Sequence, residues 1–289
     1  MKNYQIDIDM RKSLMKPVWT ALLCVALHAN ASAAVVREVP TDNVPGPAQV
    51  TVALPENYSA DGGARYPVIY LLNGHGGNHT SWAGICNLDS MATRYNVIFV
   101  CPAGQNSWYW DAPADSSMRM ESFITDDLVP WVDSTFRTVP KASQRAITGL
   151  SMGGHGALWL ALRHPDVFGN CGSTSGGVDI RPFPGSWNMA RWLGTYSDNS
   201  EVWDSHTVMN LVDRAKEARL CMIFDCGTDD FFFAVNNAFD KALTDRGVMH
   251  LYLTSPGAHN GAYWSESILP QVAFFRACFD AKTQFPDTY

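Results

Sequence analysis

Short apolar runs alternate with segments of helical periodicity from about residue 48 to the end of the chain. The runs VIYLL at 68–72 and VIFV at 97–100 are apolar without interruption, as expected for strands that are buried on both faces. Strands that alternate with helices form a parallel sheet covered by helices. The other strand-like runs are residues 49–54, expected at a sheet edge, and 146–150, 170–175, 220–224 and 250–254, and the helical patterns are residues 122–136, 156–162, 232–243 and 268–279. The sequence therefore predicts an α/β fold with a mostly parallel central sheet and helices on both faces.

The length of the chain agrees with one domain of this class. It has 289 residues, 46% of them hydrophobic, which is enough to bury a large core. Residues 172–215 depart from the alternation because they are rich in Gly, Pro, Trp and Ser. We expect them to form either a cap over the sheet or a surface loop with one or two helices. No internal repeat or linker is visible, so we predict a single domain over residues 34–289.

The N-terminal segment has the pattern of an export signal. Basic residues precede an apolar run at 18–27, and Ala31-Ser32-Ala33 follows as a small-x-small cleavage sequence. The apolar run is too short to span a bilayer. We therefore expect residues 1–33 to be a signal peptide, and the mature protein to be periplasmic or extracellular without a membrane span.

The charge distribution argues against one class of partner. The formal net charge is -7, and the sequence contains no basic block or stripe. Proteins that bind nucleic acids present such a basic surface, so we expect no nucleic-acid partner. His75 and His79 have a spacing seen in metal sites, but they lie in a glycine-rich loop and no Glu follows His75. We therefore expect no metal site.

The sequence Gly149-Leu150-Ser151-Met152-Gly153 is a GxSxG motif between a strand and a helix. This context is the one in which the motif forms a sharp turn that exposes the serine hydroxyl above the sheet. The flanking glycines meet the need for small residues at such a turn. We therefore predict that Ser151 is a catalytic nucleophile; the alternative is a serine in an ordinary glycine-rich turn.

A serine hydroxyl needs a base, and the base needs an acid that orients it. In an α/β hydrolase the order along the chain is serine, acid, histidine. His259 lies in a loop between the last strand and the last helix, which is the expected place for the base. His206, in the irregular segment, stays open as an alternative. Two adjacent acids, Asp229 and Asp230, follow the strand at 220–224 and are placed to orient the base. One of them can instead cap a helix. We favour Asp230 as the catalytic acid.

Two further groups of residues suit the chemistry of acyl transfer. The oxyanion of the reaction needs preorganised donors, and we expect them to be the backbone N–H groups of Met152 and of His75, the latter in a glycine-rich loop after the strand at 68–72. Four tryptophans could stack on a sugar or an aromatic acyl group, or could simply pack in the core. They are Trp108, Trp110, Trp187 and Trp192.

Several segments together resemble the esterase D family, of the carbohydrate esterase family one type. This family includes feruloyl and acetylxylan esterases, S-formylglutathione hydrolases and secreted mycolyltransferases. The similar segments are GLSMGGHGA around Ser151, YLLNGHGGNHTSW at 70–82, NSWYWDAP at 106–113, FITDDLVPWVDSTFRT at 123–138, DCGTDDFF at 225–232 and GAHNGAYW at 257–264. The resemblance implies an α/β-hydrolase catalytic domain that needs no cofactor. It also implies that the second of the adjacent acids, Asp230, is catalytic. Asn73 stands where the family usually has His, which is expected to alter hydrogen bonding in the loop.

The expected function is that of an exported serine esterase. We expect it to remove acetyl or feruloyl groups from plant polysaccharide or from related short acyl esters. An acyltransferase of the mycolyltransferase type, or a non-catalytic binding module on a hydrolase scaffold, are the alternatives. The sequence leaves the acyl specificity and the oligomeric state open.

Overall fold

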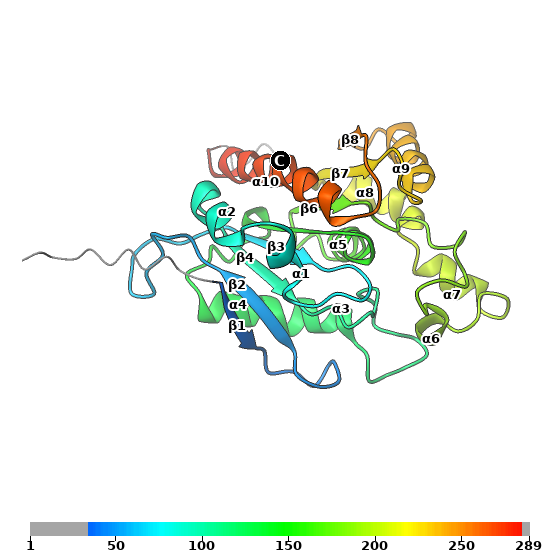
Figure 1. Cartoon of the computed structure of the whole chain (residues 1–289), viewed down its shortest axis with the longest axis horizontal. Coiled ribbons are helices and arrows are strands. Elements are labelled where there is room, and N and C mark those ends of the chain that lie inside the picture. The colour runs from blue at the N-terminus through cyan, green and yellow to red at the C-terminus, as the bar shows by residue number, and fades with distance from the viewer. Residues whose placement is uncertain (1–33, 285–289) are drawn as a thin grey trace, which may run out of the picture. The chain divides into compact units, whose positions relative to one another are not determined.

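A computed structural model describes residues 34–284 of the chain, and these contain one eight-stranded sheet (Figure 1). Its strand order is β1-β2-β4-β3-β5-β6-β7-β8. The strands are β1 (Val35–Glu38), β2 (Gln49–Ala53), β3 (Val68–Leu72), β4 (Ile98–Pro102), β5 (Arg145–Gly149), β6 (Asn170–Thr174), β7 (Cys221–Gly227) and β8 (Leu251–Ser255). β1 and β2 are antiparallel to their neighbours and the remaining pairs are parallel. The expectation of a mostly parallel α/β sheet is confirmed.

Two features of the sheet differ from the sequence prediction. We expected residues 49–54 at an edge, but β2 lies between β1 and β4. The edge position belongs to β1, a four-residue strand that precedes the alternating part of the sequence. Its side chains are mostly exposed, so it carries no apolar run that could have revealed it.

Successive side chains of the central strands enter different cores, because strand side chains point to opposite faces in turn. Val68, Tyr70 and Leu72 belong to one buried cluster, whereas Ile69 and Leu71 belong to the other. Both faces of β3 are therefore covered, which explains the uninterrupted apolar run at this strand.

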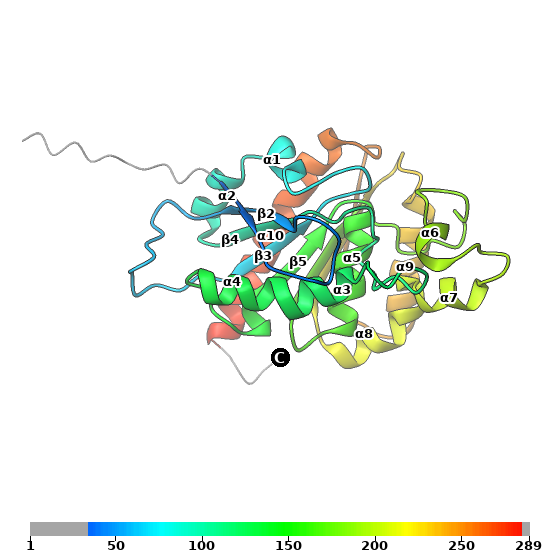
Figure 2. The ribbon, with the colours of Figure 1, turned by 90° about the horizontal axis from the view of Figure 1, so that it is seen from below.

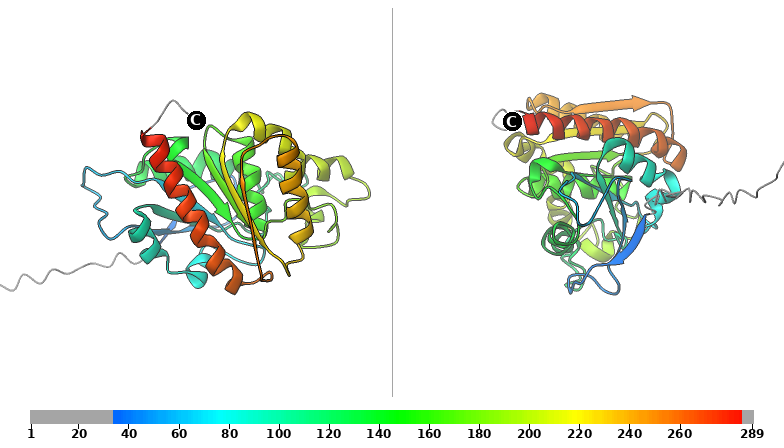
Figure 3. Two further views of the ribbon diagram at one scale, coloured as in Figure 1. Left: turned by 90° about the horizontal axis from the view of Figure 1, so that it is seen from above. Right: turned by 90° about the vertical axis from the view of Figure 1, so that its left-hand side faces the viewer.

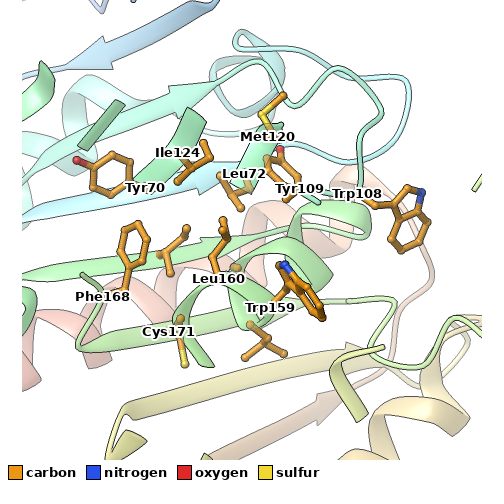
Figure 4. Packing of buried hydrophobic residues seen from close by; sticks show 14 of the residues in the cluster. Tyr70, Leu72, Trp108, Tyr109, Met120, Ile124, Trp159, Leu160, Phe168 and Cys171 are labelled. Carbon is orange, nitrogen blue, oxygen red and sulfur yellow. The ribbon is translucent and has the colours of Figure 1, made fainter. Parts of the chain in front are cut away.

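Helices cover both faces of the sheet (Figures 2 and 3). One face packs against α1 (Ser81–Ile85), α2 (Leu88–Tyr95) and the long α10 (Gly261–Gln284). The opposite face packs against α5 (Met152–Arg163), α8 (Val212–Ala218), α9 (Phe233–Asp245) and a continuous helical stretch of α3 (Met120–Ser122), η1 (Phe123–Leu128) and α4 (Val129–Thr135). Figure 4 shows part of this second core, where Tyr70 contacts Phe168 edge to face with ring centroids 5.6 Å apart.

The irregular segment at 172–215 contains short helices. These are α6 (Ala190–Leu193), α7 (Ser200–Ser205), the 3₁₀ turn η3 (Val208–Leu211) and the start of α8. Its tryptophans Trp192 and Trp203 are buried and belong to the same hydrophobic cluster as one face of the sheet. Whether it caps a substrate stays a prediction.

The described residues belong to one compact unit. Within residues 34–284, no helix combines the length and the apolar composition needed to cross a membrane. The expected signal peptide at 1–33 lies outside the described residues.

Candidate active site

Ser151 lies at a sharp turn between β5 and α5. Its backbone has φ 57° and ψ -117°, values that a residue with a side chain rarely adopts. The turn is held by backbone hydrogen bonds from Ser151 to the carbonyl of Thr174 at 3.0 Å and from Leu150 to the carbonyl of Leu72 at 3.2 Å. Neighbouring strands thus hold the serine in a conformation that costs about 1–3 kcal/mol.

The motif glycines are required because other backbone passes very close to them. A Cβ atom on Gly153 would lie 2.3 Å from the carbonyl oxygen of Leu72, and one on Gly149 would lie 2.6 Å from the backbone of Gly153. No side chain fits at these distances, so α5 can begin directly against the end of β3.

The side chains of Ser151, His259 and Asp230 form a continuous hydrogen-bonded chain. His259 Nε2 lies 2.8 Å from Ser151 Oγ, and His259 Nδ1 lies 2.8 Å from Asp230 Oδ2. A carboxylate only accepts, so the ring proton is on Nδ1 and Nε2 is free to accept from the serine hydroxyl. This arrangement matches the geometry by which a histidine activates a serine nucleophile.

The carboxylate of Asp230, which bonds to His259, is buried and has a second hydrogen-bond partner. The side chain of Asp230 is fully buried, and its Oδ1 accepts a hydrogen bond from the N–H of Phe232 at 2.8 Å. Asp229 is exposed, and its backbone N–H donates to the carbonyl of Gly257 at 2.9 Å. The structure therefore brings Asp230 to His259, while Asp229 links the acid loop to the histidine loop.

The loops that carry the acid and the base are fastened to each other. The N–H of Thr228 donates to Ser255 at 3.0 Å, and a Cβ atom on Gly227 would lie 2.3 Å from the carbonyl oxygen of Gly257. Because β7 and β8 are parallel neighbours, both loops leave the same edge of the sheet. This pairing fixes the position of His259 relative to Asp230.

Aromatic rings surround His259. The ring centroid of Phe231 lies 4.3 Å away, that of Trp264 lies 5.0 Å away and that of Phe232 lies 5.6 Å away. Packing of this kind limits rotation of the imidazole. None of these three rings was predicted to belong to the site, although each lies within five positions of the predicted acid or base.

The other histidines have partners elsewhere. His155, buried in α5, accepts from Trp110 Nε1 at 2.9 Å and donates to the carbonyl of Gly177 at 2.9 Å. His206, the alternative base, bonds to the carbonyl of Val202 at 2.7 Å. In the described part of the chain neither imidazole bonds to the Ser151 hydroxyl, so His259 is the histidine that the structure brings to the serine.

The two amides expected to bind an oxyanion lie beside Ser151. Met152 is the first residue of α5, so its N–H has no partner within the helix. His75 follows Gly74, and a Cβ atom on Gly74 would lie 3.3 Å from the Cβ of Ser151. In the described part of the chain, the N–H groups of His75 and Met152 donate to no protein acceptor. Both remain free for a substrate.

Asn73 organises the loop that carries His75. Its Nδ2 donates to the carbonyl of Gly74 at 2.8 Å, and its Oδ1 accepts from the N–H of Gly104 at 2.9 Å. The hydroxyl of Tyr109 donates to the Asn73 carbonyl at 3.1 Å. The buried Asn73 amide thus ties this loop, residues 73–77, to the segment after β4. We call residues 73–77 the oxyanion loop. Because Asn73 stands where the family usually has His, we predicted altered hydrogen bonding in this loop. The sequence did not identify Gly74, Gly104 and Tyr109 as the partners.

The four tryptophans divide into two pairs. Trp108 and Trp110 are 1% and 0% exposed, and their rings stack on each other at 5.6 Å. Core packing, the alternative weighed for them, describes both. Trp187 and Trp192 instead line a hollow of about 350 Å³ together with His75 and other residues. Only this second pair lies where it could meet a substrate.

A buried carboxyl also lies near the site. Asp225, in β7, accepts from Thr174 Oγ1 at 2.5 Å and from Gln271 Nε2 at 2.6 Å. Burial raises the pKa of Asp225 to about 6, and the hydrogen bonds partly oppose this shift. It connects β6, β7 and α10 beneath the histidine loop.

The histidines weighed as a metal pair are engaged separately. His79 Nδ1 lies 2.8 Å from Thr51 Oγ1, and its Nε2 lies 3.1 Å from Gln49 Oε1. Burial lowers the pKa of His75, and a hydrogen bond with the backbone of Trp187 partly offsets this. Over residues 34–284 no group of three or more His, Cys, Asp or Glu side chains could hold a metal ion.

Known proteins resemble this chain in sequence and in fold. A model of the family described as "Putative esterase" matches residues 42–275. An acetyl esterase from Caldicellulosiruptor saccharolyticus is 27% identical over 214 residues, which cover 69% of this chain and 79% of the relative. A ferulic acid esterase structure has a TM-score of 0.74 at 24% identity, covering 85% of this chain and 97% of that one. Serine hydrolase F of Staphylococcus aureus has a TM-score of 0.75 at 20% identity, covering 84% and 98%.

The family match spans most of the chain, and the structural likeness shows the α/β-hydrolase fold. These findings confirm the expectation of a carboxylic-ester hydrolase and agree with the resemblance to the esterase D family. The chain belongs to this family of esterases.

Proposed function

We propose that the chain hydrolyses esters through an acyl-enzyme, with Ser151 as nucleophile. His259 Nε2 takes the hydroxyl proton as Oγ attacks the ester carbonyl, and the N–H groups of Met152 and His75 stabilise the oxyanion. His259 then gives this proton to the departing alcohol oxygen. Water, deprotonated by His259, attacks the acyl carbon and releases the acid. Asp230 holds the imidazole in the required tautomer and stabilises its cation.

One observation carries this proposal. The distances of 2.8 Å on both sides of His259 join an activated serine to a buried carboxylate. The free amides of His75 and Met152, which lie close to the same serine, support the proposal as candidate oxyanion donors.

The substrates that we propose are acetyl or feruloyl esters of plant polysaccharide, or related short acyl esters. The names of an acetyl esterase relative and of a ferulic acid esterase neighbour support these acyl groups. The hollow of about 350 Å³ beside the oxyanion loop supports a ring-shaped ligand, because Trp187 and Trp192 line it. Indole rings stack on sugars and on aromatic acids alike.

We also propose that the protein is exported and that residues 1–33 are removed. The basic n-region, the apolar run and the Ala31-Ser32-Ala33 sequence support this. Expression of the full chain in a bacterial host, followed by mass spectrometry of the periplasmic protein, tests it. A mature N-terminus at residue 34 is expected, whereas full-length protein confined to the cytoplasm would contradict export.

Turnover of p-nitrophenyl acetate, p-nitrophenyl butyrate and methyl ferulate tests the catalytic role. We expect the mature protein to hydrolyse at least one of them and Ser151→Ala to abolish turnover. Ser265→Ala, in α10, is the matched control, because its hydroxyl bonds only to the carbonyl of Ala262 at 2.9 Å. Retained turnover in Ser151→Ala would refute the assignment of the nucleophile.

A further inference from the structure

Arg191 carries a guanidinium group that is mostly exposed and forms no hydrogen bond with the described part of the protein. It belongs to α6 and lies over the ring of Trp192 at 4.4 Å, with 59% of its side chain exposed. Its nearest carboxylate, Asp115, is 3.9 Å away, which is too long for a hydrogen bond. Asp115 Oδ1 accepts two hydrogen bonds from Ser117, at 2.6 and 3.1 Å, while its Oδ2 is the oxygen nearest Arg191. Among the described residues, the Arg191 guanidinium donates no hydrogen bond.

The hollow beside Arg191 has a charge opposite to that of the chain. The formal net charge of the chain is -7, yet no Asp or Glu is among the described residues that line this hollow. Arg191 is the one formally charged residue among those that line it, its carboxylate neighbour Asp115 does not line the hollow, and Gln105, Asn106 and Asn188 contribute amide side chains. A cationic hollow in an acidic protein attracts anions selectively.

The hollow is joined to the reacting atoms by short contacts. Asn106 Oδ1 accepts from the N–H of Gly76 in the oxyanion loop at 2.6 Å, and its carbonyl accepts from Trp192 Nε1 at 2.8 Å. Asn106 therefore bonds both to the oxyanion loop and to Trp192, the ring beneath Arg191. A ligand in the hollow lies next to the oxyanion donors.

A second route leads from the hollow to the base. The ring of Trp187 stacks on Phe231 with centroids 5.7 Å apart, and Phe231 lies 4.3 Å from His259. The hollow thus borders both His75 on the oxyanion side and, through these rings, the histidine. The hollow therefore adjoins the loop of one predicted oxyanion donor and the rings that pack on His259.

We propose that this hollow binds a carboxylate of the substrate and that Arg191 makes the enzyme prefer anionic esters. The proposal rests on the esterase function proposed above and names the substrate class: esters that bear a carboxylate in addition to the ester group, such as acylated acidic sugars or half-esters of dicarboxylic acids. Arginine suits this role because its planar fork pairs with both oxygens of a carboxylate. Stacking on Trp192 orients the fork before the ligand arrives.

Two pairs of esters test the preference, each made of an anionic ester and the neutral ester in which its carboxylate is methylated; the comparison between enzyme variants cancels the intrinsic difference in reactivity within a pair. p-Acetoxybenzoate and its methyl ester place the carboxylate on the alcohol side. p-Nitrophenyl hydrogen adipate and its methyl ester place it on the acyl side. The measured quantity is the ratio of kcat/KM for the anionic ester to that for the neutral ester, in which differences in enzyme concentration cancel.

We expect Arg191→Gln to lower this ratio roughly three- to tenfold in at least one pair, as for loss of a partly exposed charge-assisted pair. Arg191→Lys keeps the positive charge but lacks the planar fork, so its ratio should lie between those of the wild type and of Arg191→Gln. Arg276→Gln is the matched control, because this arginine also lies over a ring, that of Phe279, and is about four turns along α10. It should keep the wild-type ratio. An unchanged ratio for Arg191→Gln in both pairs would overturn the proposal.

A binding measurement separates this proposal from the esterase function. p-Acetoxybenzoate is titrated into Ser151→Ala and into Ser151→Ala/Arg191→Gln, with tryptophan fluorescence as the signal. Weaker binding to the double variant supports the anion site even if the wild type hydrolyses none of the esters, a result that would count against the function alone. Equal binding to both variants, together with turnover of neutral esters by the wild type, would reject the anion site alone.

Discussion

At the scale of single residues, burial distinguishes two adjacent carboxylates. Asp230 is buried against His259, whereas Asp229 is exposed and contributes only its backbone to the loop. The GxSxG motif was enough to predict Ser151, and the order of serine, acid and histidine along the chain was enough to predict His259. Spacing alone could not choose between the two acids, and the family resemblance supported the preference for Asp230. Nor could residue type separate Trp108 from Trp187, because an indole serves a core and a pocket equally well.

The two acids offer a matched test. Asp230→Asn should lower kcat for p-nitrophenyl acetate by about 10³–10⁴-fold, because an amide at this position favours the wrong tautomer of His259. Asp229→Asn should leave kcat within about twofold, as expected for an exposed side chain. Circular dichroism confirms that both variants fold. A large loss in Asp229→Asn with little loss in Asp230→Asn would reverse the assignment.

Asp225 predicts a pH dependence of stability. Its pKa is raised from 3.8 to about 6 in the folded protein, so between these values the folded state binds more protons than the unfolded state. The contribution of Asp225 to the free energy of unfolding is therefore largest below about pH 4 and is lost as the pH rises through 6.

Urea unfolding of the wild type and of Asp225→Asn at several pH values measures this effect. The free energy of unfolding of the wild type, relative to the variant, should fall by up to about 3 kcal/mol between pH 4 and pH 7. A difference that stays constant or increases over this range would contradict the prediction.

At the scale of elements, the strand runs and most helices followed from apolar patterning, but their ends did not. The helix expected at 156–162 begins at Met152, and the one expected at 268–279 begins at Gly261. Both begin close to catalytic residues, where glycines and polar residues interrupt the apolar pattern. The requirements of the site, rather than core packing, determine the sequence there.

The close contact between α5 and β3 predicts the effect of one methyl group. Gly153→Ala should destabilise the protein by about 3 kcal/mol or more, because the Cβ would lie 2.3 Å from the Leu72 carbonyl oxygen. Gly84→Ala, in α1, is the control, since a Cβ there would have nothing within 4 Å and alanine favours a helix. Thermal unfolding compares them. A melting temperature of Gly153→Ala equal to that of the wild type would contradict the contact.

The oxyanion loop predicts a kinetic effect. Asn73→Ala removes the side chain that bonds to Gly74 and Gly104, so the His75 amide should lose its fixed position. Loss of one preorganised donor lowers kcat by about 10²-fold, and KM should change less. Steady-state kinetics with p-nitrophenyl acetate measure both, and a change confined to KM would argue against this role.

At the scale of the whole molecule, the parallel order of the strands brings the loops after β5, β7 and β8 to one edge of the sheet. The alternation of strands and helices was sufficient to predict this edge as the site. It was not sufficient to predict the strand order, because contacts between distant strands leave no local pattern. The antiparallel β1 was missed for a related reason, since a short exposed strand needs no apolar run.

The separation of the catalytic residues along the chain also has a kinetic consequence. Ser151 and His259 share a hydrogen bond although 108 positions separate them. Contacts between residues so far apart raise the contact order, and a high contact order slows folding. Because β6, β7 and β8 must pair before His259 reaches Ser151, a refolding chain can acquire turnover only after these strands have paired. The first hydrolysed ester therefore reports that this part of the sheet has formed.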